Sequence, residues 1–277
     1  MPTFAAEPDR VDESQGPGPT EPRWGGAAID PSAYDLPALK VSFLLRHAPS
    51  SGKLLELGSG EGKILRTLAR ERPGLTLVGC DVRDVSPADA AYEFRRSDAR
   101  IPAADAELDA LVFVDVLEHL ADPAATLREG LRVLRPAGLL IGFIPLEGET
   151  LSAYALYRAL LGQDLYRRTK EHVQSFTRAT ALALLSDFEL VEVRYAYHAL
   201  GQWLDASFFA AARLPRLERF WWTENRYYRP ERRELSLLPR ALNGLLTLGN
   251  RVAYAESRLL ARVPWFSAGL LVVARRP

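Results

Sequence analysis

The chain has 277 residues, of which 48% are hydrophobic and 25% charged, a balance that excludes a fully disordered, collagen-like or fibrous protein. Lys+Arg and Asp+Glu both number 35, so the net charge gives no global reason to bind nucleic acid or an anionic membrane. Cys80 is the single cysteine, which excludes an intrachain disulfide and a cysteine-rich zinc site. The N-terminus does not look like a signal peptide, and no apolar stretch is long enough to span a bilayer. We therefore expect a cytoplasmic protein.

The first 30 residues are rich in Pro, Gly, Glu, Asp and Ser and poor in large apolar side chains. Such a segment cannot bury enough apolar surface to offset the entropy of ordering, so we expect a disordered arm over residues 1–30. Residues 31–277 are expected to form one domain.

Helix and strand patterns alternate through most of that domain. The first half predicts a helix from Leu36 that ends before Pro49, strands at 53–57 and 75–79, and between them a helix through Ile64 and Leu68 that Pro73 stops. The second half predicts strands at 110–114, 139–144, 188–195 and 269–274, and helices capped by Asp122 and Thr177. The Asp122 helix carries Leu127, Leu131 and Leu134 on one face and ends at 136–138.

The middle strands are continuously apolar, which is typical of strands buried on both faces. The pattern predicts an α/β fold with an open, doubly wound, mostly parallel sheet and helices on both faces. The alternation fails between Tyr197 and Pro264, where a helical insertion of about residues 199–263 precedes the last strand.

A glycine-rich loop with the sequence Glu56-Leu-Gly-Ser-Gly-Glu-Gly-Lys63 follows the first strand. Glycine lets the backbone turn tightly and approach a ligand, and the next helix directs its free N–H groups to the same place. Lys63 replaces the third glycine of a dinucleotide fingerprint, and the spacing does not fit a P-loop. The pattern E/D-x-G-x-G-x-G matches at every position, and its leading acid suits a ligand with a positive amino group.

With the motifs that follow it, this loop resembles the class I S-adenosylmethionine-dependent methyltransferases, within them the type 11 (UbiE-like) group. The resemblance covers about residues 50–197 and the last strand. Asp81, which ends the second strand, matches the acid that accepts the two ribose hydroxyls. Ser97-Asp98-Ala99 resembles the stretch at the adenine edge, Asp115–Leu120 the "vLEHl" motif and Leu134–Gly138 the "LkPGG" turn, with Ala137 where Gly is usual.

The resemblance implies S-adenosyl-L-methionine as the cofactor and methyl transfer as the activity. The cofactor-binding residues that it implies are Glu56, Gly58, Ser59, Gly60, Gly62, Asp81, Val82, Asp98, Ala99 and Asp115. It implies no metal. A general base is needed only for a protonated acceptor, and the candidates are His119, His172 and His198. Each of these also fits a hydrogen-bonded structural histidine, and Glu118 with His119 fits a pair that stabilises its loop.

Two variable segments are expected to choose the acceptor. One is Leu151–Thr169, and the other is the insertion, where Arg213–Arg240 holds eight Arg against four Glu among aromatic residues. An apolar stripe follows at Leu238, Leu242, Leu245, Val252 and Leu259. These features fit a lid over a small or lipid-like acceptor, with peripheral membrane contact through residues 213–260, and equally a helical subdomain or a subunit contact. No nucleic-acid partner is expected.

Two other functions stay open from the sequence. One is a non-catalytic nucleotide-binding or membrane-associated scaffold, and the other is a nucleotide-dependent oxidoreductase, which Lys63 disfavours. The acceptor atom and the oligomeric state are not indicated.

Overall fold

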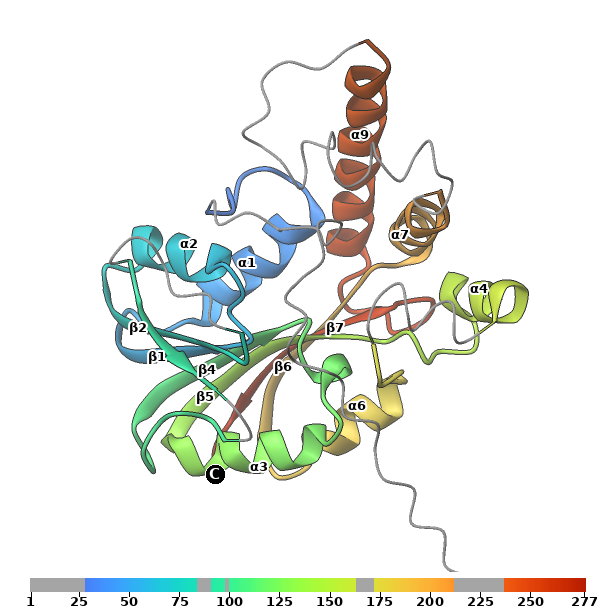
Figure 1. Cartoon of the computed structure of the whole chain (residues 1–277). Helices are drawn as coiled ribbons and strands as arrows, with labels where there is room; N and C mark the ends of the chain where they lie inside the picture. The colour runs from blue at the N-terminus through green and yellow to red at the C-terminus, as the bar shows by residue number, and fades with distance from the viewer. Residues whose placement is uncertain (1–27, 84–90, 98–99, 163–171, 212–236) are drawn as a thin grey trace, which may run out of the picture.

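The computed structural model describes residues 28–83, 91–97, 100–162, 172–211 and 237–277. Residues 1–27 of the expected arm, Asp98 and Ala99, and most of the basic stretch at 213–240 lie outside these ranges. The described residues form a seven-stranded sheet in the order β3-β2-β1-β4-β5-β7-β6 (Figure 1). Its strands are β1 (Ser51–Leu57), β2 (Gly74–Asp81), β3 (Glu93–Arg96), β4 (Leu108–Val114), β5 (Leu134–Pro145), β6 (Glu189–Ala196) and β7 (Gly269–Arg275).

Only β7 runs against its neighbours β5 and β6, and the pairs among β3, β2, β1, β4 and β5 are parallel. The expected doubly wound, mostly parallel sheet is therefore confirmed. Because β7 runs antiparallel to both β5 and β6, strand β6 points the same way as β5. The carboxyl ends of β1, β2, β4, β5 and β6 therefore share one edge of the sheet.

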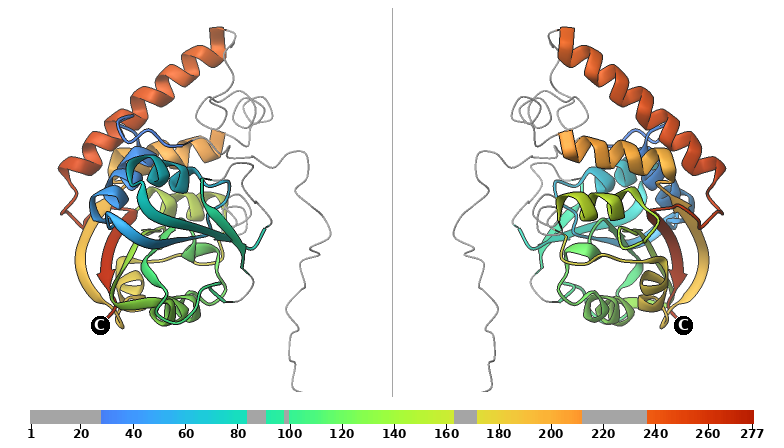
Figure 2. Two further views of the ribbon diagram at one scale, coloured as in Figure 1. Left: turned by 90° about the vertical axis from the view of Figure 1, so that its left-hand side faces the viewer. Right: turned by 90° about the vertical axis from the view of Figure 1, so that its right-hand side faces the viewer.

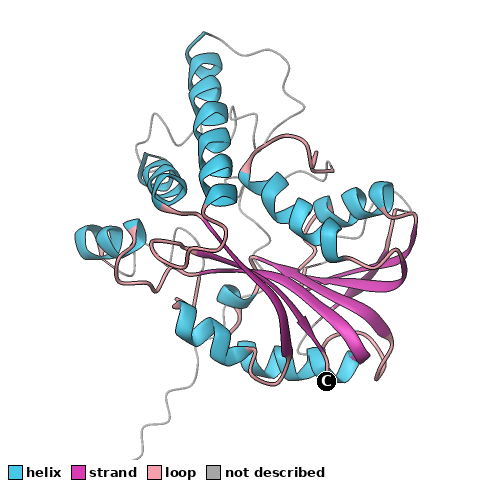
Figure 3. Ribbon diagram, turned by 180° about the vertical axis from the view of Figure 1, so that it is seen from behind, coloured by secondary structure: helices cyan, strands magenta, loops and turns pink. Residues whose placement is uncertain are grey.

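Helices cover both faces of the sheet (Figure 3). They are α1 (Leu36–His47), α2 (Lys63–Glu71), η1 (Leu117–His119), α3 (Pro123–Val133), α4 (Ala153–Leu161), α6 (Arg178–Leu184), α7 (Ala199–Ala211) and α9 (Leu237–Leu259). Successive strand residues point to opposite faces, so Leu54 packs with α1 and α2 while Leu55 packs with α3 and α6. The apolar strands thus form the middle of a three-layer core.

The helix starts follow the capping signals in the sequence. The Asp122 side chain accepts a hydrogen bond from the Ala125 N–H at 2.9 Å, and Pro123 takes the first position of α3. The Thr177 hydroxyl accepts from the Thr180 N–H at 3.2 Å at the start of α6. Both predicted caps are confirmed.

Three local features differ from the sequence prediction or add to it. Helix α3 ends at Val133, and Leu134 is already extended and begins β5, so it is not part of the helical face. Ala137 has a positive φ of 63° inside β5, where the register against β4 shifts. The edge strand β3, with the sequence Glu-Phe-Arg-Arg, was not predicted, because charged and half-exposed side chains hide its period.

The insertion contributes α7 and α9 to the described residues, as expected for a mainly helical segment. Glu256 of α9 accepts hydrogen bonds from the Leu200 and Gly201 N–H groups at 3.0 and 3.1 Å, which caps the start of α7. Buried Gln202 then joins α7 to the start of α4, by accepting from the Ala153 N–H, and to the loop before β7, by donating to the Phe266 carbonyl. Figure 2 shows α9 leaving the sheet at an angle and extending beyond it.

Candidate functional site

The glycine loop after β1 needs glycine at specific positions. Gly58, Gly60 and Gly62 have φ values of 65°, 48° and 77°, all left-handed. A Cβ atom on Gly58 would come within 2.7 Å of Val116 Cγ2, so the loop is pressed against the segment that follows β4. A Cβ atom on Gly60 would meet no atom within 4 Å. Gly60 therefore borders open space at the sheet edge where a ligand is expected.

Asp81 lies at the end of β2 and faces this loop. Its Oδ2 accepts a hydrogen bond from the Gly60 N–H at 3.0 Å, and its Oδ1 accepts one from the Arg83 N–H at 3.0 Å. The carboxylate is thus oriented by backbone donors on both sides, and each oxygen keeps acceptor capacity for a ligand hydroxyl. The next residue, Val82, is 60% exposed and lies on the rim.

Glu56 lies one layer below the loop and is 3% exposed. Burial raises the pKa of its carboxyl well above 4.5, a hydrogen bond from the Leu65 N–H opposes the shift, and the Asp81 charge adds to it. Its Oε2 and the hydroxyl of Ser59 are buried and have no hydrogen-bond partner among the described residues. Polar atoms of this kind cost free energy unless a ligand or water satisfies them.

Cys80, also beside the loop, is a packed thiol. It is fully buried, and burial raises the pKa of its thiol to about 12. The thiolate required for a nucleophile or a metal ligand is therefore disfavoured.

Asp115 directly follows β4, has a positive φ of 53° and forms an ion pair with Lys40 of α1, at 2.5 Å between Oδ2 and Nζ. The same ammonium group lies 3.8 Å from the centroid of the Phe143 ring. Of the predicted adenine-edge residues, Asp98 and Ala99 lie outside the described ranges. Ser97 donates its N–H to the Asp81 carbonyl at 2.9 Å, which fixes the start of that stretch beside β2.

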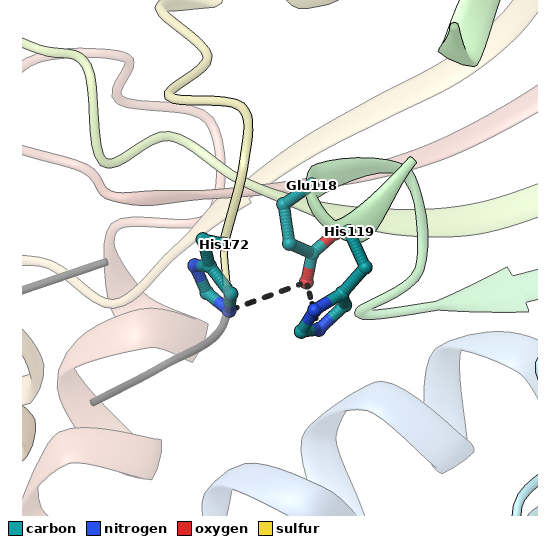
Figure 4. A group of neighbouring side chains, drawn as sticks. All are labelled: Glu118, His119 and His172. Carbon is teal, nitrogen blue, oxygen red and sulfur yellow. Dashed lines mark ion pairs between the residues drawn. The ribbon is translucent and has the colours of Figure 1, made fainter. Parts of the chain in front are cut away.

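A second group gathers where β4 and β5 end: Glu118, His119, His172 and Glu147 (Figure 4, which shows the first three). Glu118 is 1% exposed, and its backbone carbonyl accepts from the N–H groups of Val173 and Gln174, both at 2.9 Å. This fixes the segment after His172 against η1. Burial, with the charges of Asp115 and Glu147, raises the pKa of the Glu118 carboxyl.

The structure thus brings together two of the three candidate histidines, which the sequence separates by more than fifty positions. His198 lies elsewhere: it is buried at the base of the insertion, and its Nε2 contacts the Val263 carbonyl at 2.9 Å. Glu147 was missed by sequence reasoning. Its only signal is an acid two residues beyond the end of β5, at the edge where ligands bind in open parallel sheets.

Acidic side chains dominate this edge of the sheet: Glu56, Asp81, Asp115, Glu118 and Glu147. Among the described residues, Lys40 forms an ion pair with Asp115, and Arg83 forms one with Asp81. Such a site suits a ligand with positive charge and hydroxyl donors, and it disfavours a pyrophosphate. The fold and this site together define a Rossmann-like domain with an acidic edge beside its glycine loop.

Comparison with known proteins identifies the domain more closely. Residues 55–142 match the family described as "Methyltransferase domain". A "Probable S-adenosylmethionine-dependent methyltransferase" of Mycolicibacterium smegmatis is 32% identical over 110 residues, covering 36% of this chain and 41% of the relative. A ubiquinone biosynthesis O-methyltransferase of Neisseria meningitidis is 26% identical over 129 residues, covering 42% of this chain and 54% of the relative. Residues 55–142 therefore match a methyltransferase domain, and the relatives that the chain resembles include an S-adenosylmethionine-dependent methyltransferase.

Among solved structures, the [4+2]-cyclase SpnF has a TM-score of 0.53 at 20% identity, covering 87% of this chain and 80% of that one. At this identity the likeness shows the fold alone. The chain spans about half the length of the two relatives above, 41% and 54%.

Proposed function

We propose that the protein transfers a methyl group from S-adenosyl-L-methionine to a small or lipid-like acceptor. The observation that carries the proposal is the open space beside Gly60, next to the oriented carboxylate of Asp81. The glycine loop leaves this space open while it packs closely against Val116 at Gly58. The acidic edge supports a ligand with an ammonium and a sulfonium group, and the unsatisfied Glu56 Oε2 supports a bound partner near the loop. The residues present fit this cofactor.

The chain's part in such a reaction is to bind and orient. In this proposal the methionyl part lies against the open side of the loop at Gly60, and Asp81 accepts the ribose hydroxyls. Asp98 and Ala99 border the adenine in the same proposal, beyond the described residues. The bound cofactor supplies a methyl group already activated on sulfur. The protein then aligns acceptor and methyl group and excludes water.

The acceptor side lies where α4 and α7 rise from the carboxyl ends of β5 and β6. These helices and the loop before β7 carry exposed apolar side chains: Leu156, Leu160, Leu200, Trp203, Trp265 and Phe266. Tyr154 of α4 is buried instead, and its hydroxyl donates to Asp205 of α7 at 2.5 Å. The exposed set supports a greasy acceptor, and the ubiquinone-related name of one relative supports the same class.

A peripheral membrane contact through the insertion is part of this proposal. Within the described ranges no helix combines the length and apolar character needed to cross a bilayer. Contact would therefore depend on the exposed apolar side chains of α9 together with the Arg-rich stretch at 213–240.

Calorimetric titration tests the cofactor assignment. S-adenosylhomocysteine should bind and NAD should not. Asp81→Asn keeps the size of the side chain but replaces an acceptor oxygen by a donor group, so it should weaken S-adenosylhomocysteine about 10-fold or more, since each lost bond costs on the order of 1 kcal/mol. Asp105→Asn, on an 82% exposed side chain paired with Arg132, is the matched control and should bind like the parent. Tight NAD binding with no response to S-adenosylhomocysteine would contradict the proposal.

Turnover needs its own measurement, because a binding-only scaffold would pass that titration. Methyl-labelled cofactor should transfer label into a lipid extract or a pool of small metabolites. Cofactor binding without any labelled product from either pool would favour the scaffold.

A further inference from the structure

Glu118 is an unsatisfied carboxylate at the centre of a histidine pair. Its side chain is 1% exposed, and neither oxygen accepts a hydrogen bond from another described residue. The Nε2 atoms of His119 and His172 each lie 4.0 Å from its Oε1. One nitrogen or oxygen of each of the three side chains lies within 4.8 Å of the others, and Figure 4 shows them converging. A buried carboxylate in this state lacks a cation or a donor.

The imidazole ring of His172 is held in the orientation that a metal ligand requires. His172 Nδ1 lies 2.7 Å from Oε2 of Glu147, so its Nε2 is the nitrogen turned toward Glu118. A carboxylate on the second ring nitrogen is the arrangement that fixes the tautomer of metal-bound histidines. The His119 ring packs edge-on against His172, with ring centroids 4.7 Å apart. The His119 side chain is 39% exposed, which leaves a path from solvent.

We propose that Glu118, His119 and His172 bind one divalent transition-metal ion such as Zn²⁺, with Glu147 positioning His172. Two imidazole nitrogens and one carboxylate favour first-row transition metals over Mg²⁺, which prefers oxygen ligands. Bonds of about 2.0–2.2 Å would bring the ligand atoms to roughly 3–3.5 Å from one another. The present separations are 4.0 Å for each histidine nitrogen from Glu118 and at most 4.8 Å within the group, so the ligand atoms must approach by roughly 0.5–1.8 Å. A rotation of the half-exposed His119 side chain supplies much of this approach.

Three protein ligands leave at least one coordination position open. Val116, two residues before Glu118, contacts the glycine loop at Gly58, so the metal site adjoins the proposed cofactor site. An oxygen or nitrogen of an acceptor could occupy the open position, where the metal would orient it and lower its pKa. The metal site itself stands on the side-chain geometry and does not depend on the methyl-transfer proposal.

Metal binding to the chelator-treated full-length protein tests this site without cofactor or acceptor. Zn²⁺ and Co²⁺ should each bind at one ion per chain by calorimetry, and Co²⁺ should give visible absorption bands of nitrogen and oxygen coordination. Glu118→Gln, His119→Gln and His172→Gln should each weaken Zn²⁺ at least 10-fold, and Glu147→Gln should weaken it about 10- to 100-fold. Of the ligand residues, His119 has the most exposed side chain, so His119→Gln should disturb folding least.

His47→Gln is the matched control, because His47 also pairs with a glutamate, Glu192, at 3.2 Å, but on α1 and β6. It should bind Zn²⁺ like the parent. Failure of Zn²⁺ and Co²⁺ to bind at micromolar concentration, or equal affinity in the parent and in His119→Gln, overturns the proposal. The affinity for S-adenosylhomocysteine is measured separately on the metal-free protein. Binding there supports the cofactor site even if no metal binds.

Discussion

A single added Cβ atom should have different effects at Gly58 and at Gly60, because its surroundings differ at the two positions. Gly58→Ala would place Cβ 2.7 Å from Val116 Cγ2 and strain a left-handed backbone, so we expect it to lower the free energy of unfolding by more than the 1–2 kcal/mol typical of the backbone term alone. Gly60→Ala carries that backbone cost but meets no atom within 4 Å, so the protein should fold and lose affinity for S-adenosylhomocysteine.

Chemical denaturation and calorimetry on the same two variants separate the effects. An unchanged S-adenosylhomocysteine affinity in folded Gly60→Ala would show that the open space at Gly60 is not part of the ligand site.

The carboxyl of Glu56 predicts a pH dependence of stability. Burial raises its pKa well above 4.5 in the folded protein, so between pH 4.5 and the raised pKa the folded state holds a proton that the unfolded chain has lost. Stability contributed by this group is therefore lost as the pH rises, by up to about 1.4 kcal/mol per pH unit. Glu56→Gln removes the titration. The free energy of unfolding of the variant should therefore rise relative to that of the parent as the pH increases from 5 to 7.5.

Glu107→Gln supplies the control with the opposite sign. The hydrogen bond from Lys53 lowers the pKa of Glu107 to about 2, so its stabilising effect is complete above pH 4.5 and is lost as the pH falls toward 2. This variant should lose stability at neutral pH and approach the parent at low pH. Parallel pH profiles for Glu56→Gln and the parent would show that Glu56 is ionised in the folded state.

At the scale of elements, prediction succeeded where the local signal and the tertiary environment agree. The apolar runs at 110–114 and 269–274 are buried on both faces, so composition alone marks them as central strands. The caps at Asp122 and Thr177 act within one helical turn and are equally legible. The edge strand β3 is held by its hydrogen bonds to β2. Helix α3 ends early because the chain after it pairs with β4 and with Arg276. Neither set of long-range hydrogen bonds can be seen in the local sequence pattern.

The candidate site divides in the same way. The glycine loop and Asp81 lie within one β-α-β unit, so their spacing in the sequence predicts their meeting in space. The contact between His172 and Glu147 depends on a chain excursion after β5 that returns to the sheet edge, and only the folded structure brings it together with Glu118. Sequence reasoning could name the histidines there but had no means to pair them.

At the scale of the whole molecule, α9 has two different faces. Leu246, Ala253, Tyr254 and Ser257 are buried against the body of the protein, and Tyr254 stacks edge-on with Tyr34 at 5.7 Å. On another side Leu245, Leu248, Val252 and Leu259 are between 44% and 85% exposed. Because Glu256 and Ser257 also hold α7 and the end of β6, deleting residues 199–263 would break the body of the protein. Point substitutions on the exposed side of α9 test the role of the insertion without removing these hydrogen bonds.

We expect Leu245→Ser/Leu248→Ser to separate surface binding from folding. Both side chains are already at least 60% exposed, so the free energy of unfolding and the affinity for S-adenosylhomocysteine should stay near those of the parent. Co-sedimentation with vesicles containing anionic lipid should fall, and salt should weaken the binding of the parent because charge supplies part of it. Leu190→Ser/Val191→Ser removes similar exposed apolar surface from β6 and should leave vesicle binding unchanged. If the parent fails to bind such vesicles at low salt, the membrane contact is wrong. Sedimentation equilibrium of the parent and of the α9 variant then decides whether this side of α9 joins two copies of the chain.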